Sequence, residues 1–183
     1  MTTIDIPKNR STANYSCSEM FRRVIWAAGS LLIRFSPRPF FGWRRFVLRC
    51  FGARIGAHVH IYPSTRIYFP WNLSVGDWSA IGEDVLIYNL GSVTLGQSVT
   101  VSHRAHLCAG THDYTRADLP LQKLPIVIQD QAWICTDVFV GPNVTIGAGA
   151  VVGARSVVMR DVEPWGVVAG NPARFIKQRV LKA

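Results

Sequence analysis

An aliphatic residue recurs every six positions along most of this 183-residue chain, from Ile55 to Val158. The step lengthens by two residues before Val75 and before Leu95, and it is interrupted at length after Leu107. Six residues turn an α-helix by roughly 600°, so these positions would wander around a helix instead of forming one face. All the positions of this register are Ile, Leu or Val: Ile55, Ile61, Ile67, Val75, Ile81, Ile87, Leu95, Val101, Leu107, Ile128, Ile134, Val140, Ile146, Val152 and Val158.

The six-residue register predicts a mainly β fold, a parallel β-helix built as a triangular prism. Each hexapeptide supplies one short strand and a corner, and three hexapeptides complete one coil. The two-residue slips fall at every third hexapeptide, so they lengthen one corner of each coil. Glycine often follows the register residue, and we expect it where the backbone at a corner is left-handed or crowded. Stacked coils would then bury one another's interior, as in other solenoids.

Residues 1–54 precede the register and have a different pattern. The polar stretch 1–16 predicts a loose arm. Apolar residues at 3.6-residue spacing predict an amphipathic helix over 18–35, with Ser18 as its N-cap, and a second helix over 39–52. We expect these two helices to cover one end of the prism.

The rest of the chain forms the predicted β-helix domain, residues 55–183. A loop over 112–125 interrupts the register, and residues 164–183 leave it as a C-terminal tail. Within this tail, residues 174–182 are predicted to form a short helix.

Charge separates the two parts of the chain. The net charge is +9, and residues 1–54 contribute ten Lys or Arg against two acids, or +8. This basicity has two interpretations, an end cap with solvated arginines or a patch that contacts a membrane surface. Nucleic-acid binding has no supporting motif. The longest apolar run is about ten residues, half of the roughly 20 that a spanning helix needs.

The four cysteines show no CxxC spacing, and the first twenty residues lack the apolar core of a secretion signal. We therefore expect reduced thiols and a cytoplasmic protein.

The long interruption of the register contains the segment Gly110-Thr111-His112-Asp113-Tyr114. A histidine titrates near neutral pH and suits general base catalysis, typically worth about 10²–10⁴ in rate. On its own, however, His112 could equally be an ordinary histidine of a surface loop.

Further motifs surround this segment and connect it to a known family. They are Thr111-His112-Asp113, Pro125-Ile126-Val127-Ile128, Ala132-Trp133-Ile134, the stretch 140–147, the stretch 151–158 and Ala169-Gly170-Asn171-Pro172-Ala173-Arg174. With them the chain resembles the hexapeptide-repeat acyltransferases with a left-handed β-helix. The resemblance is closest to the sugar O-acetyltransferases of the galactoside, maltose and nodulation type, and within these to the colanic-acid-biosynthesis group of exopolysaccharide gene clusters.

The resemblance implies transfer of an acetyl group from acetyl-CoA to a hydroxyl of a sugar or lipid-linked oligosaccharide. It also implies a homotrimer with active sites between subunits and no metal. A basic N-terminal patch would recruit such an enzyme to lipid-linked acceptors on the cytoplasmic face of a membrane.

The same resemblance assigns roles to individual residues. His112 is the implied catalytic base, Asp113 would orient its ring or assist substrate binding, and the backbone N–H of Thr136 would stabilise the oxyanion. The other implied CoA-binding residues are Cys135, where most relatives have Gly, Ala154, Arg155, Arg174 and Lys177. The candidate acceptor-binding residues are Tyr88, Asn89, Asp84 and Trp78.

Two alternatives from other functional classes remain open at this point. His103, His106 and His112 could together hold zinc, in outline like the β-helical carbonic anhydrases. A β-helix could also serve as a non-catalytic assembly subunit.

Overall fold

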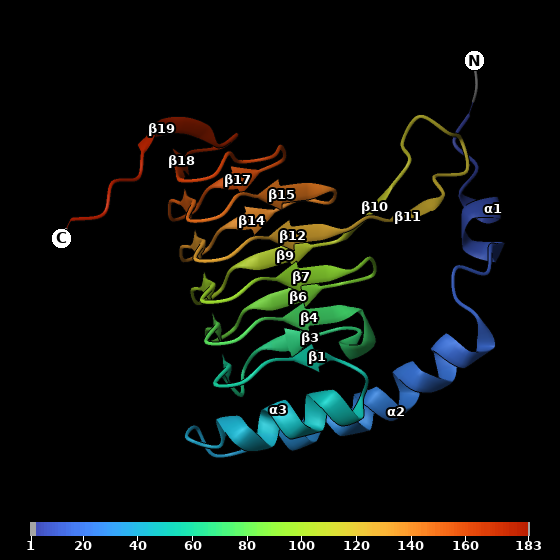
Figure 1. Ribbon diagram of the computed structural model, residues 1–183. Helices are drawn as coiled ribbons and strands as arrows, with labels where there is room; N and C mark the ends of the chain where they lie inside the picture. The colour runs from blue at the N-terminus through green and yellow to red at the C-terminus, as the bar shows by residue number, and fades with distance from the viewer. Residues whose placement is uncertain (1–2, 183) are drawn as a thin grey trace.

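Three faces of short parallel strands form a triangular prism in the computed structural model, which describes residues 3–182 (Figure 1). The predicted left-handed β-helix is confirmed. The chain passes from face 1 to face 2, then to face 3, and back to face 1 one coil higher. We call the edges between consecutive faces corner 1–2, corner 2–3 and corner 3–1.

Each face is one sheet. Face 1 contains β1 (Arg54–Ile55), β4 (Leu73–Val75), β7 (Val93–Leu95), β12 (Ile126–Ile128) and β15 (Val144–Ile146). Face 2 contains β2 (His60–Ile61), β5 (Ala80–Ile81), β8 (Thr100–Val101), β13 (Trp133–Ile134), β16 (Val151–Val152), β18 (Gly166–Ala169) and β19 (Arg174–Gln178). Face 3 contains β3 (Arg66–Ile67), β6 (Leu86–Tyr88), β9 (His106–Cys108), β14 (Phe139–Val140) and β17 (Val157–Val158).

The six-residue register is the core of the prism. Every register residue points inward and is at most 7% exposed. Strand pairing stacks equivalent register residues directly over one another, as in Ile61 over Ile81 and Ile81 over Val101 on face 2. Burial of each such side chain stabilises the fold by roughly 1.5–3 kcal/mol.

The glycines after the register residues provide space between coils. A Cβ on Gly76 would lie 2.6 Å from the backbone carbon of Gly96 in the next coil. The left-handed backbone occurs two residues further on, and mostly at other residue types, for example at His58, Trp78 and Asp84. Of the two reasons that the sequence suggested for these glycines, crowding is therefore the correct one.

Two helices cover the N-terminal end of the prism, α2 (Cys17–Arg34) and α3 (Phe41–Cys50) (Figure 1). The N-cap of α2 is Ser16 and not Ser18. The Ser16 hydroxyl accepts from the N–H of Glu19, whose carboxylate accepts from the N–H of Ser16, which is a capping box. The only other helical segment in residues 3–182 besides α1, described below, is the short turn η1 (Pro70–Asn72).

The arginines of α3 are not all solvated, as the cap interpretation had them. Arg44 is fully buried, and its guanidinium donates to the carbonyls of Ile61, Pro37 and Arg38 and to the Ser36 hydroxyl. Arg45 and Arg49 likewise donate to carbonyls of the first coil, those of Val59, Ile55 and Gly56. These bonds satisfy carbonyls at the open end of the prism, where no further coil supplies N–H groups.

The C-terminal helix expected over 174–182 is wrong. Residues Arg174–Gln178 form β19, which pairs antiparallel with β18 and closes the upper end of face 2. Val167 and Val168 of β18 pair with β16 on one side and with β19 on the other, so the chain end continues the sheet.

Candidate active site

His112 lies on a hairpin that projects from corner 3–1 of the third coil. The hairpin consists of β10 (Gly110–His112) and β11 (Leu121–Lys123), which pair antiparallel with His112 opposite Leu121 (Figure 1). It occupies the long interruption of the register. The insertion leaves the coils intact, because β12 resumes face 1 directly above β7.

The hydrogen bond of the His112 ring fixes its tautomer. Nδ1 of His112 lies 2.6 Å from the carbonyl oxygen of Leu119. A carbonyl only accepts, so Nδ1 carries the proton and the lone pair of the neutral ring is on Nε2. Leu119 has a left-handed φ of 42°, which turns this part of the loop out of an extended path. The exposed imidazole is thereby oriented as a base with Nε2 free.

Asp113 does not orient the histidine. Its carboxylate accepts from the N–H and the hydroxyl of Thr115, at 3.0 and 2.6 Å. These two bonds, the hydroxyl first, hold the pKa of Asp113 below its ordinary value. Asp113 therefore shapes the loop, and the orienting role expected of it belongs to the Leu119 carbonyl.

The described part of the N-terminal arm, residues 3–16, is structured and touches the same loop, contrary to the prediction of a loose arm. Its helix α1 (Ile6–Ser11) begins at the N-cap Asp5. The side-chain amide of Asn9 donates to the carbonyls of Asp118 and Leu119, at 2.8 and 2.7 Å. The Leu119 carbonyl oxygen thus accepts hydrogen bonds from both His112 and Asn9.

Two more contacts hold this arm. The Asp5 N–H donates to the Ala117 carbonyl, and Lys8 pairs with Asp118 at 3.4 Å. Sequence reasoning missed Asn9 as a residue that contacts the loop carrying His112. Its available signal was the Asp5–Ile6–Pro7 helix start, because aspartate at an N-cap and proline in the first turn favour a helix.

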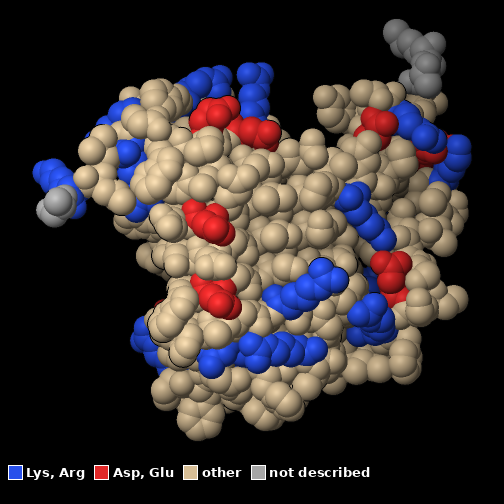
Figure 2. Space-filling view, in the orientation of Figure 1, with Lys and Arg blue, Asp and Glu red and all other residues tan. Residues whose placement is uncertain are grey.

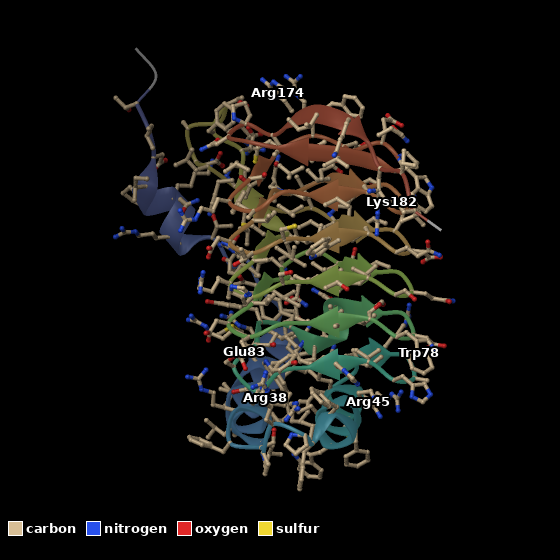
Figure 3. All side chains as sticks on the ribbon, turned by 90° about the vertical axis from the view of Figure 1, so that its left-hand side faces the viewer. Arg38, Arg45, Trp78, Glu83, Arg174 and Lys182 are labelled. Atoms are coloured by element: carbon tan, nitrogen blue, oxygen red, sulfur yellow. The ribbon has the colours of Figure 1, made fainter. Side chains whose placement is uncertain are left out.

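The candidate acceptor residues lie at three different places. Tyr88 ends β6 at corner 3–1, and strand pairing places it below Cys108, near the base of the His112 hairpin. Burial, the first cause, raises its pKa. Trp78 and Asp84 lie at corners 1–2 and 2–3, on the opposite edges of face 2, where Figure 3 labels Trp78 and Glu83, the neighbour of Asp84. Trp78 stacks on His58 there, with ring centroids 4.0 Å apart.

Asn89 is not an acceptor-binding residue. Its side chain is fully buried, and its amide bonds both backbone polar groups of Phe69, accepting from the N–H and donating to the carbonyl. The amide thereby closes the long corner 3–1 of the first coil. Because the side chain is fully buried, its remaining donor and acceptor are out of reach of a sugar.

The residues expected to bind CoA follow corner 2–3 upward. Thr136 donates its hydroxyl to the His103 carbonyl, and its own carbonyl accepts from the N–H of Arg155 in the next coil. Within residues 3–182 its backbone N–H has no hydrogen-bond acceptor. Cys135 packs against the core, and burial raises the pKa of its thiol. Ala154 is exposed beside Arg155.

Arg174 and Lys177 are brought to the upper end of the prism by β19, and both are exposed. Figure 3 labels Arg174 at this end. Neither has a carboxylate within ion-pairing distance in the described part of the chain. In a single protomer His112 lies at corner 3–1. The CoA candidates lie elsewhere, at corner 2–3 for Thr136 and Arg155 and on β19 of face 2 for Arg174 and Lys177.

The three histidines of the zinc alternative do not meet within one protomer. His106 points Nε2 into the protein, where this nitrogen has no partner, and the ring contacts Phe139 edge-on. His103 lies at corner 2–3 and His112 on the hairpin at corner 3–1. Nowhere in the described structure do three His, Cys, Asp or Glu side chains converge closely enough to hold a metal ion.

A three-faced prism of hexapeptide coils with one oriented histidine on an inserted loop defines a hexapeptide-repeat acyltransferase. Two relatives show which members of this class the chain is similar to. The chain is 44% identical over 155 residues to the colanic acid biosynthesis acetyltransferase WcaF of Escherichia coli, covering 85% of each protein. It is 34% identical over 125 residues to the galactoside O-acetyltransferase of E. coli, covering 67% of this chain and 55% of that protein. No protein-family model matches the chain.

Solved structures of acetyltransferases share the fold of this chain. The hexapeptide-repeat acetyltransferase of Vibrio cholerae in complex with acetyl-CoA superposes with a TM-score of 0.82 at 28% identity, over 91% of each chain. A maltose O-acetyltransferase of Clostridium difficile, at 23% identity, shares the fold with a TM-score of 0.82. The chain belongs to the hexapeptide-repeat acetyltransferases, and it is an O-acetyltransferase that uses acetyl-CoA.

Proposed function

We propose that His112 is the general base that activates a sugar hydroxyl of an exopolysaccharide precursor for acetylation. The observation that carries this proposal is the bond from His112 Nδ1 to the Leu119 carbonyl, which leaves Nε2 as the free base. The relation to WcaF supports the choice of an exopolysaccharide acceptor.

The reaction follows from this orientation. Nε2 takes the hydroxyl proton while the sugar oxygen bonds to the thioester carbonyl carbon of acetyl-CoA. The carbonyl oxygen becomes an oxyanion, for which the unpaired N–H of Thr136 is the donor. When the carbon–sulfur bond breaks, the imidazolium returns the proton to the leaving thiolate. Without such a base, an alcohol is too weakly acidic to attack a thioester efficiently at neutral pH.

The site is completed between copies of the chain in a homotrimer. His112 and Thr136 lie at different corners of one prism, so the base of one copy would meet the oxyanion donor of the next. Ala154, Arg155 and Cys135 then line the pantetheine arm above Thr136, and Arg174 and Lys177 meet the CoA phosphates through charge-assisted bonds. Tyr88 borders the acceptor side.

Replacing His112 by Ala tests the chemistry. We expect turnover to fall about 10²–10⁴-fold, with acetyl-CoA binding and thermal stability unchanged, while His58→Ala at corner 1–2 keeps full activity. Near-normal turnover of His112→Ala would remove the base assignment. Co-expressed His112→Ala and Thr136→Pro chains should regain activity that neither has alone, since a mixed interface can combine an intact base with an intact N–H. No recovery in such mixed oligomers would argue against a shared site.

The end of the prism formed by α2 and α3 would contact an anionic membrane surface. In residues 3–182 no helix combines the length and apolar character needed to cross a bilayer. Yet this end exposes an apolar surface. In Figure 2 a band of Lys and Arg side chains runs across the lower part of the molecule, and the atoms below this band belong to uncharged residues. The exposed apolar residues are Met20, Phe21, Val24, Ile25, Leu31, Leu32, Phe35, Phe40, Trp43 and Phe46.

Apolar residues beside arginines are the pattern of an interfacial anchor. Flotation with anionic vesicles tests it. The wild-type chain should float and a Phe21→Ser/Phe35→Ser variant should not; equal recovery of both with the vesicles would reject this surface.

A further inference from the structure

A groove of about 590 Å³ runs along the first coil between α2 and β3. Its floor is apolar and includes Trp26, Ile33, Ile67 and Phe69, all of them buried. The Trp26 indole N–H donates to the Ile67 carbonyl at 2.8 Å and fixes the helix against the strand. The groove is therefore a defined feature of the packing between the cap and the prism.

Three arginines line this groove without an acidic partner. They are Arg23, Arg34 and Arg66, and no carboxylate of the described residues lies within 4.0 Å of their guanidinium groups. Just outside the groove, Arg38 does find an acid, Glu83, at 3.5 Å (Figure 3). Asp84 is the one acidic residue of the lining, which leaves it with a net charge of +2, three minus one.

The arginines are spread along the groove. Arg23 stacks near the rings of Tyr15 and Phe69, at the end toward corner 3–1. Arg34 lies eleven residues further along α2, or about 16 Å along the helix axis. Arg66 stands on the opposite wall, on β3. Such an apolar channel with cationic walls suits an amphiphile that carries phosphate groups.

A column of side chains leads from the groove toward the catalytic loop. Tyr68 lies in the groove lining, and its ring meets that of Tyr88 edge-on with centroids 4.8 Å apart. Tyr88 in turn lies below Cys108 in the strand register, four residues before His112. Adjacent strands are about 4.8 Å apart, so Tyr68 is about 10 Å below the base of the hairpin.

The far rim of the groove opens onto the apolar end of the prism. Leu31 belongs to the groove lining and is also half exposed among the apolar residues of α2. A prenyl chain entering from a bilayer would thus meet continuous apolar surface. A nucleotide would instead place a polar ribose and base against it.

We propose that this groove binds the diphosphate and the adjoining isoprene units of a polyprenyl diphosphate-linked sugar. The phosphates lie between Arg34 and Arg66, and the sugar extends over Tyr68 and Tyr88 toward His112. This assignment rests on the proposed acetyl transfer to a sugar hydroxyl, and it names the carrier of that sugar.

Direct binding tests the groove apart from catalysis. The probe is farnesyl diphosphate, titrated into the full-length protein by calorimetry, with farnesol, inorganic diphosphate and UDP-glucose as comparison ligands. Each charge-assisted contact is worth about a factor of ten or more. We therefore expect Arg34→Gln/Arg66→Gln to weaken farnesyl diphosphate at least tenfold. The control is Arg54→Gln, which removes an arginine of β1 that is also exposed but lies outside the groove.

The outcomes separate the alternatives. Tighter binding of UDP-glucose than of farnesyl diphosphate would overturn the lipid carrier, and equal binding by the wild type and the double variant would overturn the groove. His112→Ala should bind farnesyl diphosphate normally. If acetyl transfer to any sugar fails while the arginine-dependent binding persists, the proposed function is wrong and the groove stands. If the double variant binds weakly and still acetylates a simple free sugar, both hold.

Discussion

Asn9 provides the sharpest test of how the proposed catalytic base His112 is held. It belongs to α1, outside the prism, and its amide donates to the carbonyls of Asp118 and Leu119. The Leu119 oxygen also receives Nδ1 of His112. Asn9→Ala removes both amide bonds and leaves the histidine bond in place, so it changes the support of the base without touching it.

The expected magnitude follows from these two bonds. A neutral hydrogen bond contributes about 0.5–1.5 kcal/mol, so losing two weakens docking of the arm on the loop by roughly 1–3 kcal/mol. At about 1.4 kcal/mol per factor of ten, the docked population falls about 5- to 150-fold relative to the undocked one. Because the Leu119–His112 bond persists part of the time, we expect kcat to fall by about tenfold.

The assay is steady-state kinetics with acetyl-CoA and a sugar acceptor, beside a thermal melt. The KM for acetyl-CoA and the melting temperature should not change, because α1 has no buried residue and lies outside the core. Lys8→Gln is the matched control from the same helix, since it removes only the ion pair between the exposed Lys8 and the mostly covered Asp118, at 3.4 Å. Asn9→Asp should be worse than Asn9→Ala, because it sets a carboxylate against two carbonyl oxygens. An unchanged kcat in Asn9→Ala would refute the positioning role.

Four other predictions concern stability and CoA binding. Burial lowers the pKa of His106. The neutral histidine is therefore compatible with the folded state above its unfolded pKa of about 6.5, and stability is lost as the pH falls below that value. In urea unfolding at pH 5 to 7, His106→Phe should reduce this loss of stability toward acid pH. Arg44→Met leaves buried carbonyls without donors and should cost roughly 3 kcal/mol or more in the same assay. Gly76→Ala should destabilise by about 1–3 kcal/mol through its contact with the next coil. Gly42→Ala on α3 would place its Cβ 3.7 Å from the guanidinium of Arg45, an ordinary contact, and should stabilise by up to about 1 kcal/mol. Arg174→Ala should raise the KM for acetyl-CoA about tenfold with kcat kept, and an unchanged KM would exclude a phosphate contact.

The coils were predictable from the sequence because an inward aliphatic position recurs in every hexapeptide and decides the fold. A register residue such as Ile81 has no alternative placement once its neighbours in the column are apolar. The ends of the chain were not predictable in this way. Residues 174–178 have a pattern compatible with a helix, and the free edge of β18 makes them a strand. This is tertiary context overriding local preference.

The site was predictable only in part, for a similar reason. A motif can identify His112, but it does not reveal which group accepts the hydrogen bond from its Nδ1. That group is a backbone carbonyl, at Leu119, and carbonyls leave no trace in residue identity. Asn89 misled for the opposite reason: a polar residue in a turn suggests binding, whereas here its amide closes the corner of the coil below.

The proposed CoA site and the proposed acceptor groove lie toward opposite ends of the prism axis. CoA candidates Arg174 and Lys177 are on β19, above β18, while the arginine-lined groove is on the first coil. On face 2, β2 and β18 are five strand spacings apart, or about 24 Å. In a trimer with parallel prisms, all three α2–α3 ends would face one side. An acceptor held at a membrane would then enter from that side and acetyl-CoA from the other. His112 lies on the third coil between them, so neither substrate needs to pass the other to reach Nε2.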